Sequence, residues 1–192
     1  MPFIDKHKLL FIHIPKTGGT SIEEKFGVNN TRNELYSNKN AVIDGILMAK
    51  QHWLPRIIER NFPHRFRDYK KFVIVRNPYV RVISEYFYQF PGQRVSFNDF
   101  VLNKLNPKER DHYLPQHLYF EDIKYDYVLR TESLNEDFSK MSRDFSFDDS
   151  LKRSNKRGEG SEKRMDLLTP EIIKKINSLY EKDFKMFEYE MK

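Results

Sequence analysis

Short apolar runs alternate along the chain with stretches whose apolar residues recur at helical spacing. The runs at 8–14, 72–76 and 125–129 are rich in β-branched and aromatic residues, which predicts buried strands. Helical spacing predicts helices at 19–26, 55–61, 79–89, 97–105, 134–142 and 170–182. Alternating strands and helices are typical of an α/β fold with a mainly parallel β-sheet flanked by helices.

The first predicted strand is followed by a lysine, two glycines and three hydroxyl residues, which lead into the predicted helix at 19–26. A turn of this kind presents backbone N–H groups and the positive end of a helix dipole, and glycines let an anion approach closely. Lys16 precedes Gly18 and Gly19, whereas the lysine of a Walker A loop follows its glycines. Taken alone, the pattern fits either a phosphate-binding turn or an ordinary turn with a solvated lysine.

A second strand-to-helix turn follows the run 72–76. Arg76 lies at the end of the predicted strand, while Asn77 and Pro78 suit the cap and the first position of the next helix. Ser84 lies about two turns into that helix. An arginine at a strand tip and a serine on the following helix make a second candidate anion site.

These two turns, in this order and at this separation, resemble the sulfotransferase superfamily. The resemblance is greatest to the branch with heparan-sulfate-type 2-O-sulfotransferases and small bacterial members, and it covers about residues 8–190. The segment Arg130 to Leu134 is similar to an Arg-x-Glu-x-Leu turn of that branch, and Leu168 to Phe187 resembles its closing helix. The resemblance implies one sulfotransferase-like domain over residues 1–192, with a P-loop-kinase-like sulfotransferase fold.

The same resemblance implies the reaction. It is transfer of a sulfuryl group from 3′-phosphoadenosine-5′-phosphosulfate (PAPS) to an acceptor hydroxyl by in-line displacement, with a saccharide as the favoured acceptor and no metal. The family's first turn binds the 5′-phosphosulfate and its second turn the 3′-phosphate. The residues assigned in this way are Lys16, Thr17, Gly18, Gly19, Thr20 and Ser21 at the first site, and Arg76 and Ser84 at the second.

Sulfuryl transfer needs a cation beside the leaving oxygen and a base that takes the acceptor's proton. Lys16 is the predicted cation. His52 is the predicted base, because imidazole titrates near neutrality and because residues 50–59 resemble the family's His-x-Thr-Ala-x-Glu segment, which holds its proposed base. Leu54 and Pro55 depart from that segment.

Other titratable residues have weaker assignments. Glu24 and Asp44 are the alternative bases if His52 points away from the site. We expect His13, inside an apolar run, to be a core residue, and His112 and His117 to line an acceptor cleft. The spacing of the six histidines predicts no metal site.

The segment 152–164 has six basic and two acidic residues among Ser, Asn and Gly, and cannot build a core. It is predicted to be a mobile basic loop. Its simplest interpretation is a solvated loop, and the more specific one is a flap over the nucleotide. Basic, glycine-containing loops cover the 3′-phosphate in several sulfotransferase branches, and such a loop is similar to Lys156, Arg157 and Gly158.

Composition limits the class of protein. The 192 residues suffice for one α/β domain, contain no cysteine and carry a net charge of +6. No run approaches the roughly 18 apolar residues of a membrane span, and residues 1–8 have no signal-peptide core. We therefore expect a soluble, cytoplasmic protein; its oligomeric state has no signal in the sequence.

Two other functions fit parts of the pattern. A P-loop kinase-like phosphotransferase would use ATP and magnesium, but it needs an acidic metal ligand at a strand end, where Arg76 stands. A non-catalytic binder of nucleotides or nucleic acid would use the basic surface. The aromatic residues are spaced as in a core, so no nucleic-acid partner is expected. Residues 28–50 and 90–120, where an acceptor pocket is expected, contain no motif that names the acceptor.

Overall fold

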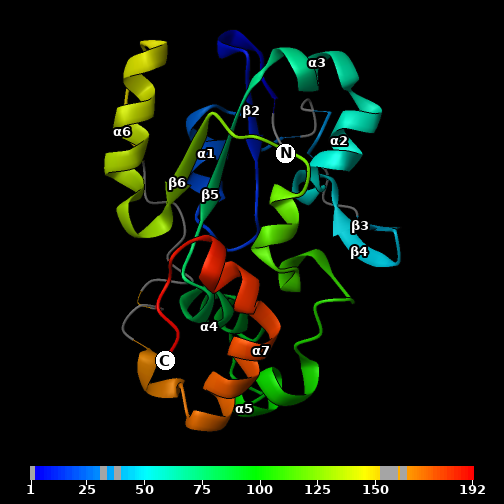
Figure 1. The fold of residues 1–192 in the computed structure, drawn as a ribbon, viewed down its shortest axis with the longest axis vertical. Helices are drawn as coiled ribbons and strands as arrows, with labels where there is room; N and C mark the ends of the chain where they lie inside the picture. Colours follow the sequence, from blue (N-terminus) through cyan, green and yellow to red (C-terminus); the bar gives the residue numbers. More distant parts are fainter. Residues whose placement is uncertain (1–2, 31–33, 37–39, 152–159, 161–163) are drawn as a thin grey trace.

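The computed structural model describes residues 3–30, 34–36, 40–151, 160 and 164–192. Its central sheet has the strand order β1–β2–β5–β6, with β1 at Phe3–Ile4, β2 at Leu9–Ile12, β5 at Lys70–Val75 and β6 at Tyr127–Arg130. The last three strands are parallel, whereas β1 runs antiparallel to β2. Parallel strands end at the same edge of a sheet, so the turns that follow β2, β5 and β6 lie together at what we call the carboxyl edge (Figure 1).

The helices confirm the predicted alternation of strands and helices. They are α1 (Gly19–Lys25), α2 (Pro55–Asn61), α3 (Pro63–Asp68), α4 (Pro78–Gln89), α5 (Phe97–Asp99), α6 (Leu134–Phe145) and α7 (Pro170–Met186). The predicted helix at 97–105 is α5 followed by a π-helical turn, η3 (Phe100–Lys104). Short 3-10 helices are η1 (Asp5–His7), η2 (Lys50–His52), η4 (Asp111–Tyr113), η5 (Gln116–Phe120), η6 (Thr131–Ser133) and η9 (Met165–Leu167).

The sequence analysis missed three elements: β1, α3 and a hairpin formed by β3 (Asn40–Ile43) and β4 (Ile46–Ala49). Most of the hairpin is exposed, so it lacks the apolar alternation that marks a half-buried strand. The predicted strand at 8–14 ends two residues early, at Ile12. His13 and Ile14 therefore already belong to the turn at the carboxyl edge.

Helices cover both faces of the sheet, because successive residues of a strand point to opposite faces. Leu10 and Ile12 pack in one cluster with residues of α2, α3 and η5, whereas Leu9 and Phe11 pack in another with α1 and α6. β2 and the second half of β5 are buried on both sides, which explains their nearly continuous apolar sequence, whereas Val128 in the edge strand β6 is 47% exposed.

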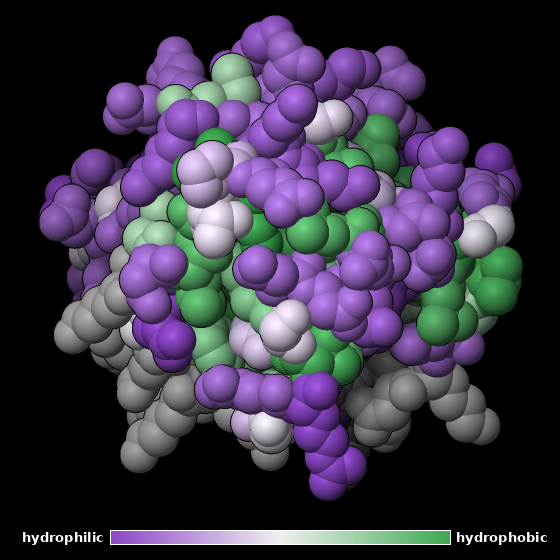
Figure 2. Space-filling model, turned by 90° about the horizontal axis from the view of Figure 1, so that it is seen from below, coloured by the Kyte–Doolittle hydropathy of each residue, from purple (hydrophilic) through white to green (hydrophobic). Residues whose placement is uncertain are grey.

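A third apolar cluster lies below the carboxyl edge and joins α4, η3 and α7. Figure 2 views the molecule from this side, and hydrophobic side chains show among hydrophilic ones in the middle of the face. This cluster anchors α4, the helix that follows the second predicted anion turn.

The predicted start of α4 is confirmed in detail. The side chain of Asn77 accepts hydrogen bonds from the backbone N–H groups of Tyr79 and Val80, and Pro78 is the first residue of α4. Ser96 and Thr169 cap α5 and α7 in the same way. Within the described residues, no helix combines the length and the apolar character that a membrane crossing requires.

Candidate active site

The first turn has a constrained backbone. Lys16 and Gly18 have positive φ angles of 68° and 90°, and such a conformation is strained for a lysine. Thr17 is fully buried, and its hydroxyl donates a hydrogen bond to the carbonyl of Ile14 at 2.9 Å. Its side chain thus fixes the turn, whereas Thr20 and Ser21 are half-buried in the first turn of α1.

Gly19 is required for a reason that the sequence did not suggest. A Cβ atom at this position would lie 2.4 Å from Cδ2 and Nε2 of the His13 ring, closer than real contacts allow. The glycine therefore leaves room for His13 as well as for an anion.

Side chains from later parts of the chain hold the first turn in place. Arg76 donates from Nη1 to the carbonyl of Lys16 at 3.1 Å, and Arg81 donates from Nε to the carbonyl of Pro15 at 3.0 Å. Thr131, directly after β6, donates its hydroxyl to the carbonyl of Thr17 at 2.7 Å. The two predicted anion turns are therefore adjacent at the carboxyl edge.

The second turn is held through its backbone. The side-chain amide of Gln116 accepts from the N–H of Arg76 at 2.9 Å and donates to its carbonyl at 2.7 Å. Glu132, from the Arg-x-Glu-x-Leu segment, accepts from the N–H of Asn77 at 2.8 Å. Ser84, the other predicted residue of this site, is 4% exposed on α4.

Positive charge concentrates where the two turns meet. Burial lowers the pKa of Lys16 to about 8; Glu85 opposes this shift, and the charges of Arg76 and Arg81 add to it. Arg76 and Arg81 are themselves buried. The ammonium group of Lys16 lies 3.9 Å from the centre of the Tyr88 ring, in a cation–π contact. The three positive charges repel one another, and a bound anion would relieve this repulsion.

His52 is buried and held by a carboxylate. Its Nδ1 lies 2.7 Å from Oδ2 of Asp111, and that oxygen also accepts from the N–H of Ala49 at 2.9 Å. Burial alone would raise the pKa of Asp111, but the hydrogen bond and charge of His52 outweigh it and lower the pKa to about 2. Asp111 is therefore an acceptor, so His52 carries its proton on Nδ1 and leaves Nε2 as a lone pair.

This environment corrects one expectation. Burial lowers the pKa of His52 to about 3, against the opposing effect of the hydrogen bond to Asp111. The imidazole thus titrates well below neutrality and is neutral at physiological pH. It is present in the form that a general base requires, but it holds a proton weakly.

Three histidines form a row, each with Nδ1 2.7 to 2.8 Å from a carboxylate. The ring centres of His13 and His52 are 4.9 Å apart, and those of His52 and His112 are 5.1 Å apart. Glu23 is the partner of His13, and Glu85 is the partner of His112. His13 is buried, as expected of a core residue, yet it faces the first turn at Gly19.

His52, Asp111 and His112 are close enough to be considered as metal ligands. However, both oxygens of Asp111 already accept hydrogen bonds: Oδ2 from His52 and Ala49, and Oδ1 from the N–H of His112 at 2.8 Å. Asp111 is thus engaged in orienting His52 and in holding the backbone of residues 49 and 112.

The remaining candidates lie elsewhere. His117 pairs with Asp183 of α7 at 2.8 Å and takes no part in the row of rings. Glu24 is exposed on α1, and Asp44 is exposed in the hairpin turn, where it pairs with Arg56 at 3.2 Å. Neither alternative base lies in a buried setting. Lys156, Arg157 and Gly158 lie outside the described residues, so the proposed flap stays a prediction.

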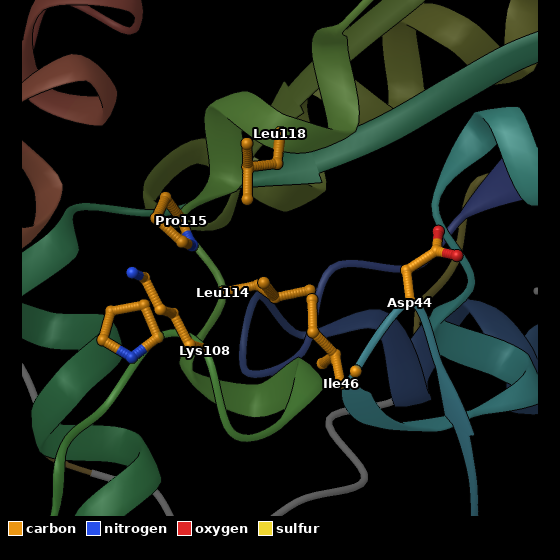
Figure 3. A pocket seen from close by; sticks show the side chains of 8 residues that line it. Asp44, Ile46, Lys108, Leu114, Pro115 and Leu118 are labelled. Carbon is orange, nitrogen blue, oxygen red and sulfur yellow. The ribbon is translucent and has the colours of Figure 1, made fainter.

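A cavity of about 470 Å³ opens between the β3–β4 hairpin and the segment 107–118 (Figure 3). Apolar side chains dominate its wall, and Asp44 and Lys108 add charge at its rim. The same two segments adjoin His52 and its partner, since Ala49, the last residue of β4, donates to Asp111, which lies in η4. These are also the segments in which the sequence predicted an acceptor pocket without naming its contents.

Comparison with known proteins assigns the family. A model described as "Sulfotransferase family" matches residues 2–190. The chain belongs to the sulfotransferase family. Carbohydrate sulfotransferase 10 of Danio rerio is 33% identical over 86 residues, which are 43% of this chain and 23% of that protein. The match thus spans less than a quarter of the length of that relative. No solved structure matches this chain, so the P-loop-kinase-like fold stays a prediction.

Several site residues escaped the sequence analysis. Asp111, Glu85 and Gln116 act over separations of 59, 27 and 40 positions from their partners His52, His112 and Arg76. Such pairs leave no local pattern.

Proposed function

We propose that this sulfotransferase transfers a sulfuryl group from PAPS to an acceptor hydroxyl, with a saccharide as the acceptor class. The observation that carries the proposal is the gathering of Lys16, Arg76 and Arg81 at two adjacent turns. A nucleotide donor with a phosphate group at each end would neutralise these three positive charges. Support for the saccharide comes from the name of the Danio rerio relative.

Each residue has a distinct task in this account. The Nε2 atom of His52 takes the proton of the acceptor hydroxyl. The acceptor oxygen then forms its bond to sulfur while the bond from sulfur to the 5′-phosphate oxygen breaks, and the electron pair stays on that oxygen. Lys16 neutralises the negative charge that develops on that oxygen, and this lowers the barrier because the attraction is stronger in the transition state than in the ground state. Asp111 keeps His52 in the tautomer that can accept the proton.

The second turn completes the donor site. Arg76 and Ser84 bind the 3′-phosphate, and Gln116 fixes the backbone of Arg76. The cavity between the β3–β4 hairpin and the segment 107–118 receives the acceptor. Its apolar wall suits the faces of sugar rings, and its charged rim suits their hydroxyl groups.

The direct test is a transfer assay with ³⁵S-labelled PAPS and a panel of simple sugar glycosides. We expect labelled product and a matching amount of 3′-phosphoadenosine-5′-phosphate, without added metal. Lys16→Ala should lose most of this activity, and its matched control is Lys182→Ala, which removes an exposed lysine of α7 and should keep it. Transfer of label from γ-³²P-labelled ATP with magnesium, and none from PAPS, would contradict the proposal.

A further inference from the structure

The pair formed by His112 and Glu85 has no task in the mechanism above. Nδ1 of His112 lies 2.8 Å from Oε2 of Glu85, which is 2% exposed. The other oxygen of Glu85, Oε1, is buried and has no hydrogen-bond partner among the described residues. A buried carboxylate oxygen without a hydrogen bond is costly, and a positive charge on the adjacent imidazole would offset part of that cost.

The position of His112 connects the two halves of the site. Its ring is 5.1 Å from that of His52 on one side, and it stacks on Tyr88 at 5.4 Å on the other. Tyr88 in turn carries the ammonium group of Lys16 on its ring. Arg81 donates to the carbonyls of both His112 and Pro15, which ties the segment of His112 to the first turn.

The row also leads from the interior toward solvent. The side chain of His52 is 8% exposed and that of His112 is 13% exposed, whereas Tyr88 is 47% exposed. A proton that reaches His52 must leave before the next turnover, and the adjacent ring in the outward direction is His112.

We propose that His112, held by Glu85, is a proton-relay residue that receives the acceptor proton from His52 and passes it to solvent. The inference rests on the proposed function. The proton leaves Nε2 of His52 and binds Nε2 of His112, directly or through one water. His112 then carries protons on both nitrogens, and the adjacent carboxylate of Glu85 stabilises this imidazolium. His52 returns to its neutral form, so no net charge stays in the interior.

His112 acts through His52 and is therefore a positioning and relay residue. Its removal should slow turnover without weakening the binding of the donor. The test is His112→Ala, assayed for release of 3′-phosphoadenosine-5′-phosphate from PAPS with water or a sugar glycoside as acceptor, with and without added imidazole. We expect a loss of at least about 10-fold in turnover, an unchanged dissociation constant for the bisphosphate, and partial recovery with imidazole.

Two further variants sharpen the result. His64→Ala removes an exposed histidine of α3, away from the two turns and the cavity, so turnover should stay within about 2-fold. The double variant His52→Ala/His112→Ala should be no slower than His52→Ala, since the two act as one unit. Unchanged turnover in His112→Ala, or a loss that imidazole does not restore, would overturn the relay. A wild-type protein that does not bind the bisphosphate would instead overturn the proposed function.

Discussion

The Nδ1 atom of His52 lies 2.7 Å from Oδ2 of Asp111, although 59 positions separate the two residues. The pairing fixes which ring nitrogen carries the proton and which can accept one. It is the arrangement that histidine bases use in other acyl- and group-transfer sites. A histidine suggested only by its neighbours in the sequence thus acquires a partner that gives it a chemical role.

Replacing Asp111 with Asn tests this role. Asn keeps the size of the side chain but can favour the wrong tautomer of His52, so turnover should fall by about 10²-fold or more. Turnover of His52→Ala should fall by a similar factor. Bisphosphate affinity, measured by calorimetry, should stay nearly constant in both variants. The control Glu24→Gln, at the exposed alternative base on α1, should keep full turnover; if it loses activity instead, the assignment of the base is wrong.

Lys16→Ala should lower turnover by more than it weakens bisphosphate binding. The charge of Lys16 is most valuable when the leaving oxygen becomes negative, so its loss raises the barrier more than it costs ground-state binding. Steady-state kinetics and calorimetry on the same preparation give the two quantities. Equal losses in both would reduce Lys16 to a simple phosphate contact.

The lowered pKa of Lys16 predicts how donor affinity depends on pH. Above a pKa of about 8 the free protein holds Lys16 neutral, while a bound dianion favours the charged form. Binding above pH 8 must therefore take up a proton, and affinity should fall by up to about 10-fold per pH unit. Titration calorimetry in two buffers of different ionisation enthalpy measures both effects. Lys16→Arg, whose charge persists at this pH, should bind the bisphosphate with an affinity that does not fall above pH 8. If its affinity still falls, another group takes up the proton.

Gly19→Ala should destabilise the protein by about 1–3 kcal/mol, because its Cβ would overlap the ring of His13. The matched control is Gly92→Ala, where the nearest atom lies 3.9 Å away, and there the change should stay within about 0.5 kcal/mol. Urea unfolding of the two variants provides the comparison. Equal stabilities would show that His13 can move aside freely.

The sequence predicts those parts of the fold that depend on local pattern. Phe72 to Val75 is a continuous apolar run, and Asn77 and Pro78 are a helix start that depends on nearby atoms. The π-helical turn at 100–104 and the exposed hairpin at 40–49 have no such local signature.

The site divides in the same way. The first turn is visible in the sequence because lysine and glycines must be adjacent there. Glu85 and Asp111 are not visible, because each acquires its role by contact with a residue distant in the chain. The pKa of His52 could not be predicted either, since it depends on burial, which only the folded chain defines.

The central claim is that the two turns form one site for a nucleotide with phosphates at both ends. Calorimetric titration of the wild-type protein with 3′-phosphoadenosine-5′-phosphate, compared with ATP and magnesium, tests it most directly. The account predicts micromolar or tighter binding of the bisphosphate, weakened in Arg76→Ala, and much weaker binding of ATP. Micromolar binding of ATP with magnesium and none of the bisphosphate would contradict it.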